Sequence, residues 1–222
     1  MKILAFEFSS AQRSVAVLSA DASGQTLVAS EIVESSPRNT MKPLAMTEAA
    51  LRDAGIDREQ IECIALGLGP GSYTGIRAAI ALAQGWQLAR EVKIIGVSSA
   101  ECVAVKAQAD GIRGQVSVVI DAQRQEFYFA GYELDANGVR EIAALRLVKP
   151  DEVADRERAG DLLVGPEVTR WFPSVRLIFP SAATVARLAA SRTDFVSADR
   201  IEPIYLRETT FVKAPPSRAM PL

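Results

Sequence analysis

The sequence contains no histidine among its 222 residues. Without an imidazole, the chain has no Ser-His or Cys-His relay and no histidine-ligated metal site. It has only two cysteines, Cys63 and Cys102, which argues against a disulfide framework and is typical of a reducing compartment. These absences leave Asp, Glu, Lys and Tyr as the side chains available for catalysis, and they predict no metal site.

An excess of positive charge and a long apolar run are also missing. The net charge is −2 and the pI is about 5.4, which argues against direct binding of a nucleic acid. No stretch approaches the ~18 apolar residues of a membrane span, and the apolar run at the N-terminus is too short for a signal peptide. We therefore expect a cytoplasmic location and no membrane partner.

The order of apolar and polar segments predicts an α/β fold. Residues 2–8, 13–19 and 25–33 are typical of three strands joined by short turns, which would form an antiparallel meander. Helices and buried strands then alternate up to residue 109, with the first helix capped by Asn39 or Thr40 and ended by Gly55. Two strands around a polar turn at 121–125 begin a second series. We expect two subdomains, residues 1–110 and residues 111–222, the second ending in an extended Pro-rich tail.

The segment GLGPGSYTGIRAA, residues 67–79, concentrates glycine at the start of a helix. It lacks the third glycine of the dinucleotide-binding fingerprint, because Ser72 stands there, and no Gly-Lys-Ser/Thr follows. Two interpretations remain open. The loop is a tight turn with Ser72 as the N-cap, or its backbone N–H groups bind an anion at a helix N-terminus. We expect Gly69, Gly71 and Gly75 to place the helix first and to contact an anion second.

Two helices in the first half of the chain are more apolar than a solvent-exposed helix needs to be. The helix from about Tyr73 to Arg90 has only a narrow polar stripe, and the preceding helix is similarly apolar. Either both are enclosed within one domain, or they form an interface with another subunit. The candidate interface residues are Met41, Leu44, Ala45, Glu48, Ile76, Ala79, Ile80 and Ala83.

Several segments together resemble the TsaB (YeaZ) family. They are KILAFEFSSAQRSVAVL, ALGLGPGSYTGIRAAIALAQGW, IIGVSSAE, VVIDAQRQEFYFAGYE and IEPIYLRE, and they run from residue 2 to about residue 213. The resemblance implies an actin-like ATPase fold (ASKHA, ribonuclease H-like), with two subdomains of mixed sheets flanked by helices. It also implies a part in forming N6-threonylcarbamoyladenosine (t6A) at position 37 of ANN-decoding tRNAs.

In that family the protein is a scaffold without catalysis of its own, filed among M22 glycoprotease-like sequences. The resemblance implies pairing with a catalytic TsaD-type subunit through the two apolar helices, together with a TsaE-type ATPase. It implies only indirect contact with tRNA, a homodimer as a candidate state of the isolated chain, and ATP or ADP at the subunit junction as a candidate cofactor. We expect no intrinsic cofactor.

The sequence departs from the family pattern at its first turn. The family usually has Asp-Thr-Ser or Asp-Thr-Thr, whereas here Glu7 is followed by Phe8, Ser9 and Ser10. In actin-like ATPases the acid of this turn arranges metal and phosphates, so a longer Glu alters nucleotide geometry. The candidate nucleotide- or anion-binding residues are Glu7, Ser9, Ser10, Gly69, Gly71 and Ser72.

Two alternative functions remain open from the sequence. An M22-type hydrolase would need a metal site or an activated nucleophile, and the chain offers no histidine for either. An actin-like nucleotide-binding phosphotransferase would need acids at two phosphate loops, for which only Glu7 and Asp121 are candidates. Glu126 follows Asp121 across a turn, where paired acids are usually solvated. We expect no catalytic residue.

Overall fold

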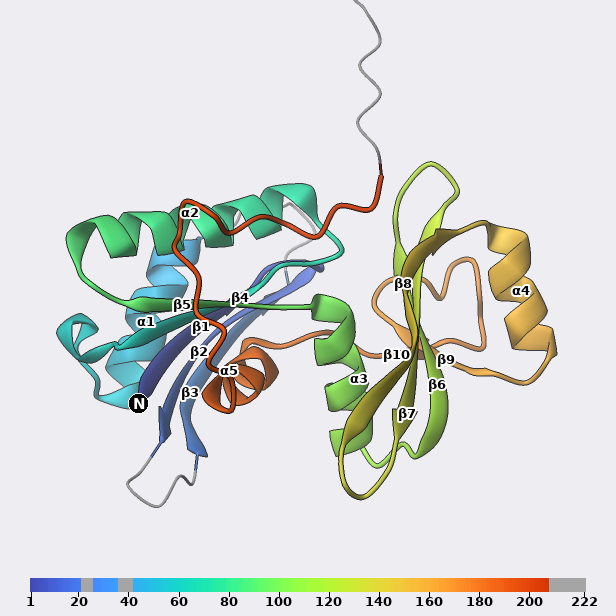
Figure 1. Cartoon of the computed structure of the whole chain (residues 1–222), viewed down its shortest axis with the longest axis horizontal. Helices are drawn as coiled ribbons and strands as arrows, with labels where there is room; N and C mark the ends of the chain where they lie inside the picture. Colours follow the sequence, from blue (N-terminus) through green and yellow to red (C-terminus); the bar gives the residue numbers. More distant parts are fainter. Residues whose placement is uncertain (21–25, 36–41, 208–222) are drawn as a thin grey trace, which may run out of the picture.

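The computed structural model describes residues 1–20, 26–35 and 42–207. Two five-stranded mixed sheets stand side by side (Figure 1). The first sheet has the order β3-β2-β1-β4-β5, with β1 at Lys2–Glu7, β2 at Gln12–Ala20, β3 at Thr26–Ser35, β4 at Cys63–Gly67 and β5 at Lys93–Val97. The second has the order β10-β9-β6-β7-β8, with β6 at Gly114–Asp121, β7 at Phe127–Leu134, β8 at Val139–Val148, β9 at Leu162–Gly165 and β10 at Arg176–Leu177.

The predicted antiparallel meander is confirmed. Strand β1 pairs antiparallel with β2, which pairs antiparallel with β3. On its other side β1 pairs with β4 in parallel, and β4 pairs with β5 in parallel. All five residues of β4 are buried, as expected for an almost continuous apolar strand that is covered on both faces.

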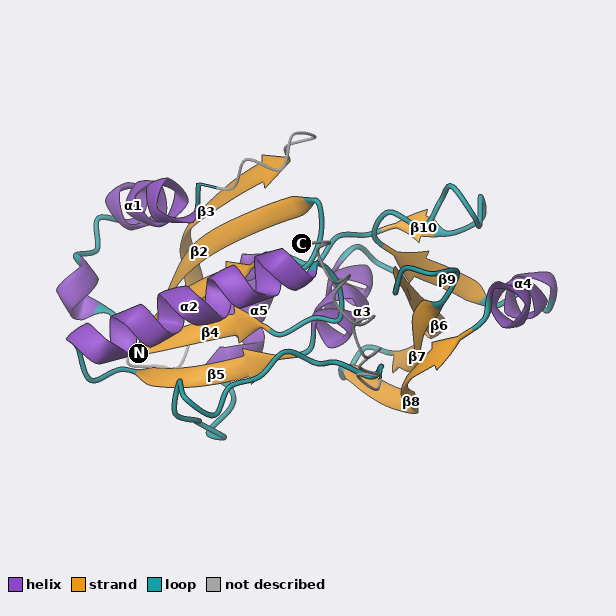
Figure 2. Ribbon diagram, turned by 90° about the horizontal axis from the view of Figure 1, so that it is seen from above, coloured by secondary structure: helices purple, strands orange, loops and turns teal. Residues whose placement is uncertain are grey.

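Helices cover both faces of the first sheet (Figures 1 and 2). On one face, α1 (Pro43–Ala54) and α2 (Tyr73–Ala89) share a core with Leu4 and Phe6 of β1. On the other face, α5 (Ala182–Ala190) packs against Ile3 and Ala5. Alternate side chains of β1 thus enter two separate cores, because successive residues of a strand point to opposite faces.

Helix α3 (Ser99–Ala109) lies between the two sheets and packs on the second (Figure 2). The opposite face of the second sheet is covered by α4 (Pro150–Arg158), through Val153, and by the loop that carries Phe172. A short 3₁₀-helix, η1, at Arg58–Gln60 precedes β4. The predicted α/β architecture, with mixed sheets flanked by helices, is confirmed.

The last described segment returns to the first sheet. Helix α5 belongs to its core, Val196 forms an antiparallel bridge with Ile94, and the Ile204 N–H donates to the Leu68 carbonyl. The division at residue 110 remains a prediction, and residues 208–222 of the expected tail lie outside the described residues.

Residues typical of helix ends lie at the ends of the two apolar helices. Pro43 occupies the first turn of α1, and Gly55 ends that helix in the left-handed conformation, with φ of 63°. The expected caps Asn39 and Thr40 lie outside the described residues. Ser72 caps α2, because its side-chain oxygen accepts a hydrogen bond from the Gly75 N–H.

Candidate functional site

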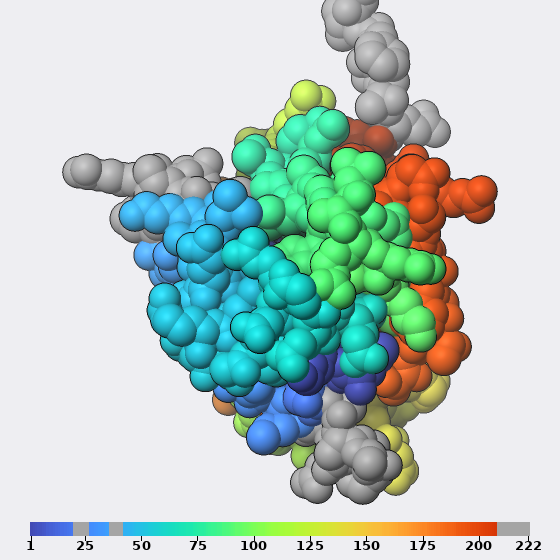
Figure 3. Space-filling view, turned by 90° about the vertical axis from the view of Figure 1, so that its left-hand side faces the viewer, coloured from blue at the N-terminus to red at the C-terminus, as the bar shows by residue number. Residues whose placement is uncertain are grey.

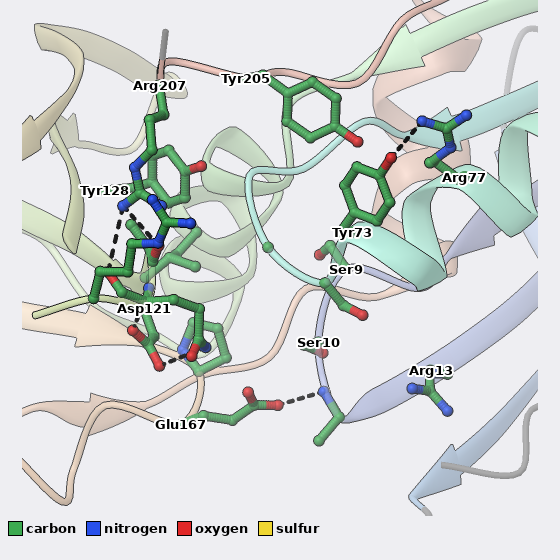
Figure 4. Close-up of a pocket in the computed structure, with 18 residues that line it drawn as sticks. Ser9, Ser10, Arg13, Tyr73, Arg77, Asp121, Tyr128, Glu167, Tyr205 and Arg207 are labelled. Carbon is green, nitrogen blue, oxygen red and sulfur yellow. Dashed lines mark hydrogen bonds between the residues drawn. The ribbon is translucent and has the colours of Figure 1, made fainter. Parts of the chain in front are cut away.

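A cleft of about 990 Å³ separates the two sheets (Figure 4). Its walls come from segments that are far apart in the sequence. Three of them are turns: the β1–β2 turn, the glycine loop before α2, and the β6–β7 turn. The remaining walls come from β2, β6, β7, α2, the loop after β9 and the segment after α5. The sequence predicted the first two segments as a site, and the structure brings them together at this cleft.

The β1–β2 turn and the glycine loop are in direct backbone contact. The Ser72 N–H donates to the Ser9 carbonyl at 2.6 Å. Gly71 has φ of 149°, and a Cβ added there would lie 2.2 Å from the same carbonyl oxygen. Only glycine allows this approach. The loop therefore places α2 against the first turn, which supports the tight-turn interpretation, while Ser9, Ser10, Gly71 and Ser72 also line the cleft.

Glu7 is a correction to the predicted site. Its side chain is 0% exposed and does not line the cleft. The Ser9 N–H and the Ser99 Oγ–H donate to its two carboxylate oxygens at 2.7 and 2.8 Å. A Cβ on Gly67 would lie 1.9 Å from Glu7 Oε2, so the glycine makes room for the carboxylate. The Glu7 carboxylate is therefore enclosed within the protein and does not reach the cleft.

Burial controls the titration of Glu7. Desolvation raises the pKa of the Glu7 carboxyl above its ordinary value, and the hydrogen bonds from Ser9 and Ser99 oppose that shift. Ser99 Oγ also accepts the Gly69 N–H at 3.1 Å. The chain Glu7–Ser99–Gly69 therefore supports the glycine loop from inside the fold. Gly69 belongs to this support, because its N–H already donates to Ser99 Oγ, and its expected contact with an anion stays a prediction.

The β6–β7 turn lines the cleft from the second sheet. Gln123, Arg124 and Gln125 all have positive φ, of 62°, 57° and 59°. Such a run is costly for residues with a Cβ, at about 1 kcal/mol or more per residue. Asp121 holds the turn, since its carboxylate accepts the Gln123 N–H at 2.8 Å, and it also pairs with Arg170. Asp121 thus lines the cleft, unlike Glu7.

Cationic and aromatic side chains complete the cleft. Tyr73 stacks on Tyr205 with ring centroids 5.6 Å apart, and Arg77 donates to the Tyr73 hydroxyl at 2.6 Å. Sequence reasoning missed these residues, although Tyr205 lies in the quoted segment IEPIYLRE. Four arginines line the cleft, namely Arg13, Arg77, Arg124 and Arg207. The cleft thus suits an anion with an apolar or aromatic part better than it suits a cation.

No group of three or more His, Cys, Asp or Glu side chains in the described part of the chain could hold a metal ion. Cys63 and Cys102 are buried and unpaired with each other, and desolvation raises the pKa of both thiols, to about 11 for Cys63. A thiol with a raised pKa is a poor nucleophile at neutral pH. Within the described ranges no helix is long and apolar enough to cross a membrane.

The predicted partner residues on α2 are wrong. Ile76, Ala79, Ile80 and Ala83 belong to the core beneath the helix, and Ala79 and Ala83 are 0% exposed. The apolar stripe that faces its own sheet was mistaken for the outer one, because this helix has small or apolar residues on both sides. The exposed positions of α2 include Ala81, Gly85 and Leu88, and Leu88 is 91% exposed.

The predicted partner residues on α1 are exposed, in contrast to those on α2. Leu44, Ala45 and Glu48 are exposed, and Leu44 is 66% exposed. Met41 lies outside the described residues. Helix α1 and the C-terminal end of α2 both reach the surface at one end of the molecule (Figure 3, light blue and green). This pair of exposed helix faces, with Leu44 and Leu88 as its large apolar side chains, is called the helical face below.

Comparison with known proteins agrees with this geometry. A family model described as "TsaD: tRNA N6-adenosine threonylcarbamoyltransferase" matches residues 35–186. The "tRNA threonylcarbamoyladenosine biosynthesis protein TsaB" of Escherichia coli is 30% identical over 81% of this chain and 85% of its own length. The protein of the same name in Haemophilus influenzae is 28% identical over 80% and 84%.

Solved structures show the same fold. "YeaZ from Pseudomonas aeruginosa" is 28% identical, with a TM-score of 0.76 over 92% of this chain and 99% of that one. A second crystal structure, of an uncharacterized protein with similarity to peptidase YEAZ from Pseudomonas aeruginosa, gives a TM-score of 0.77 at 28% identity, over 93% and 99%.

Proposed function

This chain belongs to the TsaB family, and from that premise we propose that it is a scaffold subunit in the formation of t6A at position 37 of ANN-decoding tRNAs. The family model it matches is described by the transferase activity of TsaD. The similarity to TsaB proteins covers most of both chains, whereas a histidine-based metal site would need residues that this chain lacks. The transferase chemistry is therefore assigned to a TsaD-type partner.

The helical face is the observation that carries the proposal. Leu88 and Leu44 are large apolar side chains, 91% and 66% exposed, on two helices. Burying such side chains against a partner is worth roughly 1.5–3 kcal/mol each. Around them, Ala45, Ala81 and Gly85 are small enough to let a partner helix approach closely. The face thus exposes large apolar and small side chains on two helices, which suits a helical interface.

Pairing with a TsaD-type subunit is assigned to this face. The same face, when no TsaD is present, would serve a homodimer of the isolated chain. A TsaE-type ATPase and ATP or ADP at the subunit junction belong to the proposal as further components of the assembly. Contact with tRNA is assigned to the partner, because a chain with net charge −2 gains little from counterion release. A cytoplasmic location follows from that role.

Reconstitution with purified components tests the proposal. A TsaD-type protein and a TsaE-type ATPase from the same source would be combined with unmodified tRNA, the threonylcarbamoyl donor and ATP, with and without this chain. The t6A content of the tRNA would be measured by mass spectrometry. We expect t6A only when this chain is present. Equal t6A in its absence would contradict the scaffold role.

The same preparation addresses the M22-type hydrolase and the phosphotransferase. Glu7 is buried and Asp121 is held by Arg170 and its own turn, so neither alternative gains a free acid from the structure. We expect the isolated chain to show no casein cleavage and no ATP turnover with added Mg²⁺ or Zn²⁺. Turnover that disappears in an Asp121→Asn variant would favour the phosphotransferase.

A further inference from the structure

Glu167 has a backbone conformation that its side chain does not favour. It lies in the loop after β9 and has φ of 61°, in the left-handed region where glycine is the usual residue. The position carries a charged side chain in spite of this conformational cost. The Glu167 side chain is exposed and lines the cleft.

The carboxylate of Glu167 reaches across the cleft to the β1–β2 turn. Its Oε1 accepts a hydrogen bond from the backbone N–H of Ala11, a residue 156 positions earlier in the chain (Figure 4). The bond connects a loop of the second sheet with a turn of the first. It is a charge-assisted bond, the stronger kind of hydrogen bond to a backbone donor.

The surroundings of this contact favour an anion. Among the described residues four arginines line the cleft, of which Arg207 already pairs with Glu126, and the acids that line it are Asp121 and Glu167. Asp121 already pairs with Arg170 and accepts the Gln123 N–H. The Glu167 carboxylate is thus the anion that this chain itself supplies to the backbone donor of the first turn.

We propose that Glu167 is an internal ligand, whose carboxylate occupies an oxyanion site at the Ser9–Ala11 turn and ties the two halves of the molecule together. A phosphate-type oxyanion from solution binds at this turn only in exchange for Glu167. Displacing the carboxylate also releases the cross-cleft bond, so the cleft opens as the anion enters. The inference does not depend on the TsaB role, because it concerns the isolated chain and a surface away from the helical face.

The test measures binding of inorganic pyrophosphate to the isolated chain by calorimetry at low ionic strength. Glu167→Gln removes the charge and keeps the shape, and Glu167→Gly removes the side chain and relieves the backbone. Glu91→Gln, at an exposed position before β5, is the control for net charge. We expect both Glu167 variants to bind pyrophosphate about tenfold or more tightly than the parent chain, the value of one charge-assisted bond. Glu91→Gln should match the parent.

ATP is the second probe. A gain for ATP as well as pyrophosphate would assign the site to the phosphates of a nucleotide, and a gain for pyrophosphate alone would assign it to a free anion. Small-angle X-ray scattering should show a larger radius of gyration for Glu167→Gly than for the parent. No gain in either Glu167 variant, a gain in Glu167→Gly alone, or an equal gain in Glu91→Gln would overturn the proposal. Each of these results would leave the pairing through the helical face untouched.

Discussion

The β1–β2 turn and the β6–β7 turn face each other across the cleft, and each follows a strand that ends in an acidic residue. At the first turn Glu7 is fully buried and accepts hydrogen bonds from Ser9 and Ser99. At the second turn Asp121 lines the cleft and pairs with Arg170. Two acids at the ends of corresponding strands thus differ in solvation, and the space left by Gly67 receives the carboxylate of the first.

Each turn also holds a glutamate with a shifted pKa, Glu7 at the first and Glu126 at the second, and the two shifts have opposite signs. Burial raises the pKa of Glu7. At the second turn, hydrogen bonds from Lys149 and Arg207 lower the pKa of Glu126 below its ordinary value. The first turn is therefore a structural support inside the fold, and the second is an ion-paired surface. The following variants are chosen to separate these two roles.

The largest expected effect is the loss of close approach at the first turn. Gly71→Ala places a Cβ against the Ser9 carbonyl and forces a side chain into a positive φ. We expect it to lower the free energy of unfolding by more than about 1 kcal/mol, measured by urea denaturation.

Gly85→Ala is the matched control, because it lies in α2 and an added Cβ would meet nothing within 4 Å. It should raise the free energy of unfolding by up to about 1 kcal/mol, through helix propensity. Equal effects of the two changes would mean that the glycine loop does not rest on the first turn.

A smaller effect is expected from Glu7→Gln, and it should depend on pH. A folded-state pKa above the unfolded value stabilises the fold fully at low pH, and this contribution is lost as the pH rises through the folded pKa. The amide keeps the shape of the carboxyl and does not titrate. As the pH rises above the ordinary Glu value and through the raised folded pKa, the parent should therefore lose stability relative to Glu7→Gln. Parallel stability curves for the two proteins would contradict the buried, desolvated carboxyl.

The smallest effect is expected from Glu126→Gln, with the opposite sign. The pKa of Glu126 is lowered, so its ionised form stabilises the fold above the unfolded pKa, and that contribution is lost as the pH falls. The variant should be slightly less stable than the parent at neutral pH, and the difference should vanish in acid. Because the ion pairs of Glu126 with Lys149 and Arg207 lie at the surface, added salt should reduce this difference in stability. Chemical unfolding at two pH values and two salt concentrations checks this.

Much of the fold could be predicted from local chemistry. Pro43, Gly55 and Ser72 marked helix ends, and the apolar alternation of the first three strands predicted the meander. The first turn and the glycine loop, which the sequence named as candidate anion-binding segments, meet through the backbone hydrogen bond from Ser72 to Ser9.

The wrong predictions for individual residues have physical causes. Helix α2 carries Ile80 on one side and Leu88 on another, so apolar pattern alone did not show which side meets the sheet. Glu7 turns inward because Gly67 leaves room for its carboxylate, a long-range contact with no local signal. The left-handed residues of the second turn, and Glu167, adopt conformations that their residue types do not suggest.

The central claim is that the chain acts by pairing through its helical face, and the most direct measurement is co-elution with a TsaD-type protein from the same source. Leu88→Glu should abolish or strongly weaken co-elution while the thermal melting of the isolated chain stays unchanged. Leu177→Glu is the control, because Leu177 is 51% exposed on β10 in the second sheet. It should co-elute like the parent. Undiminished pairing of a folded Leu88→Glu protein would contradict the account.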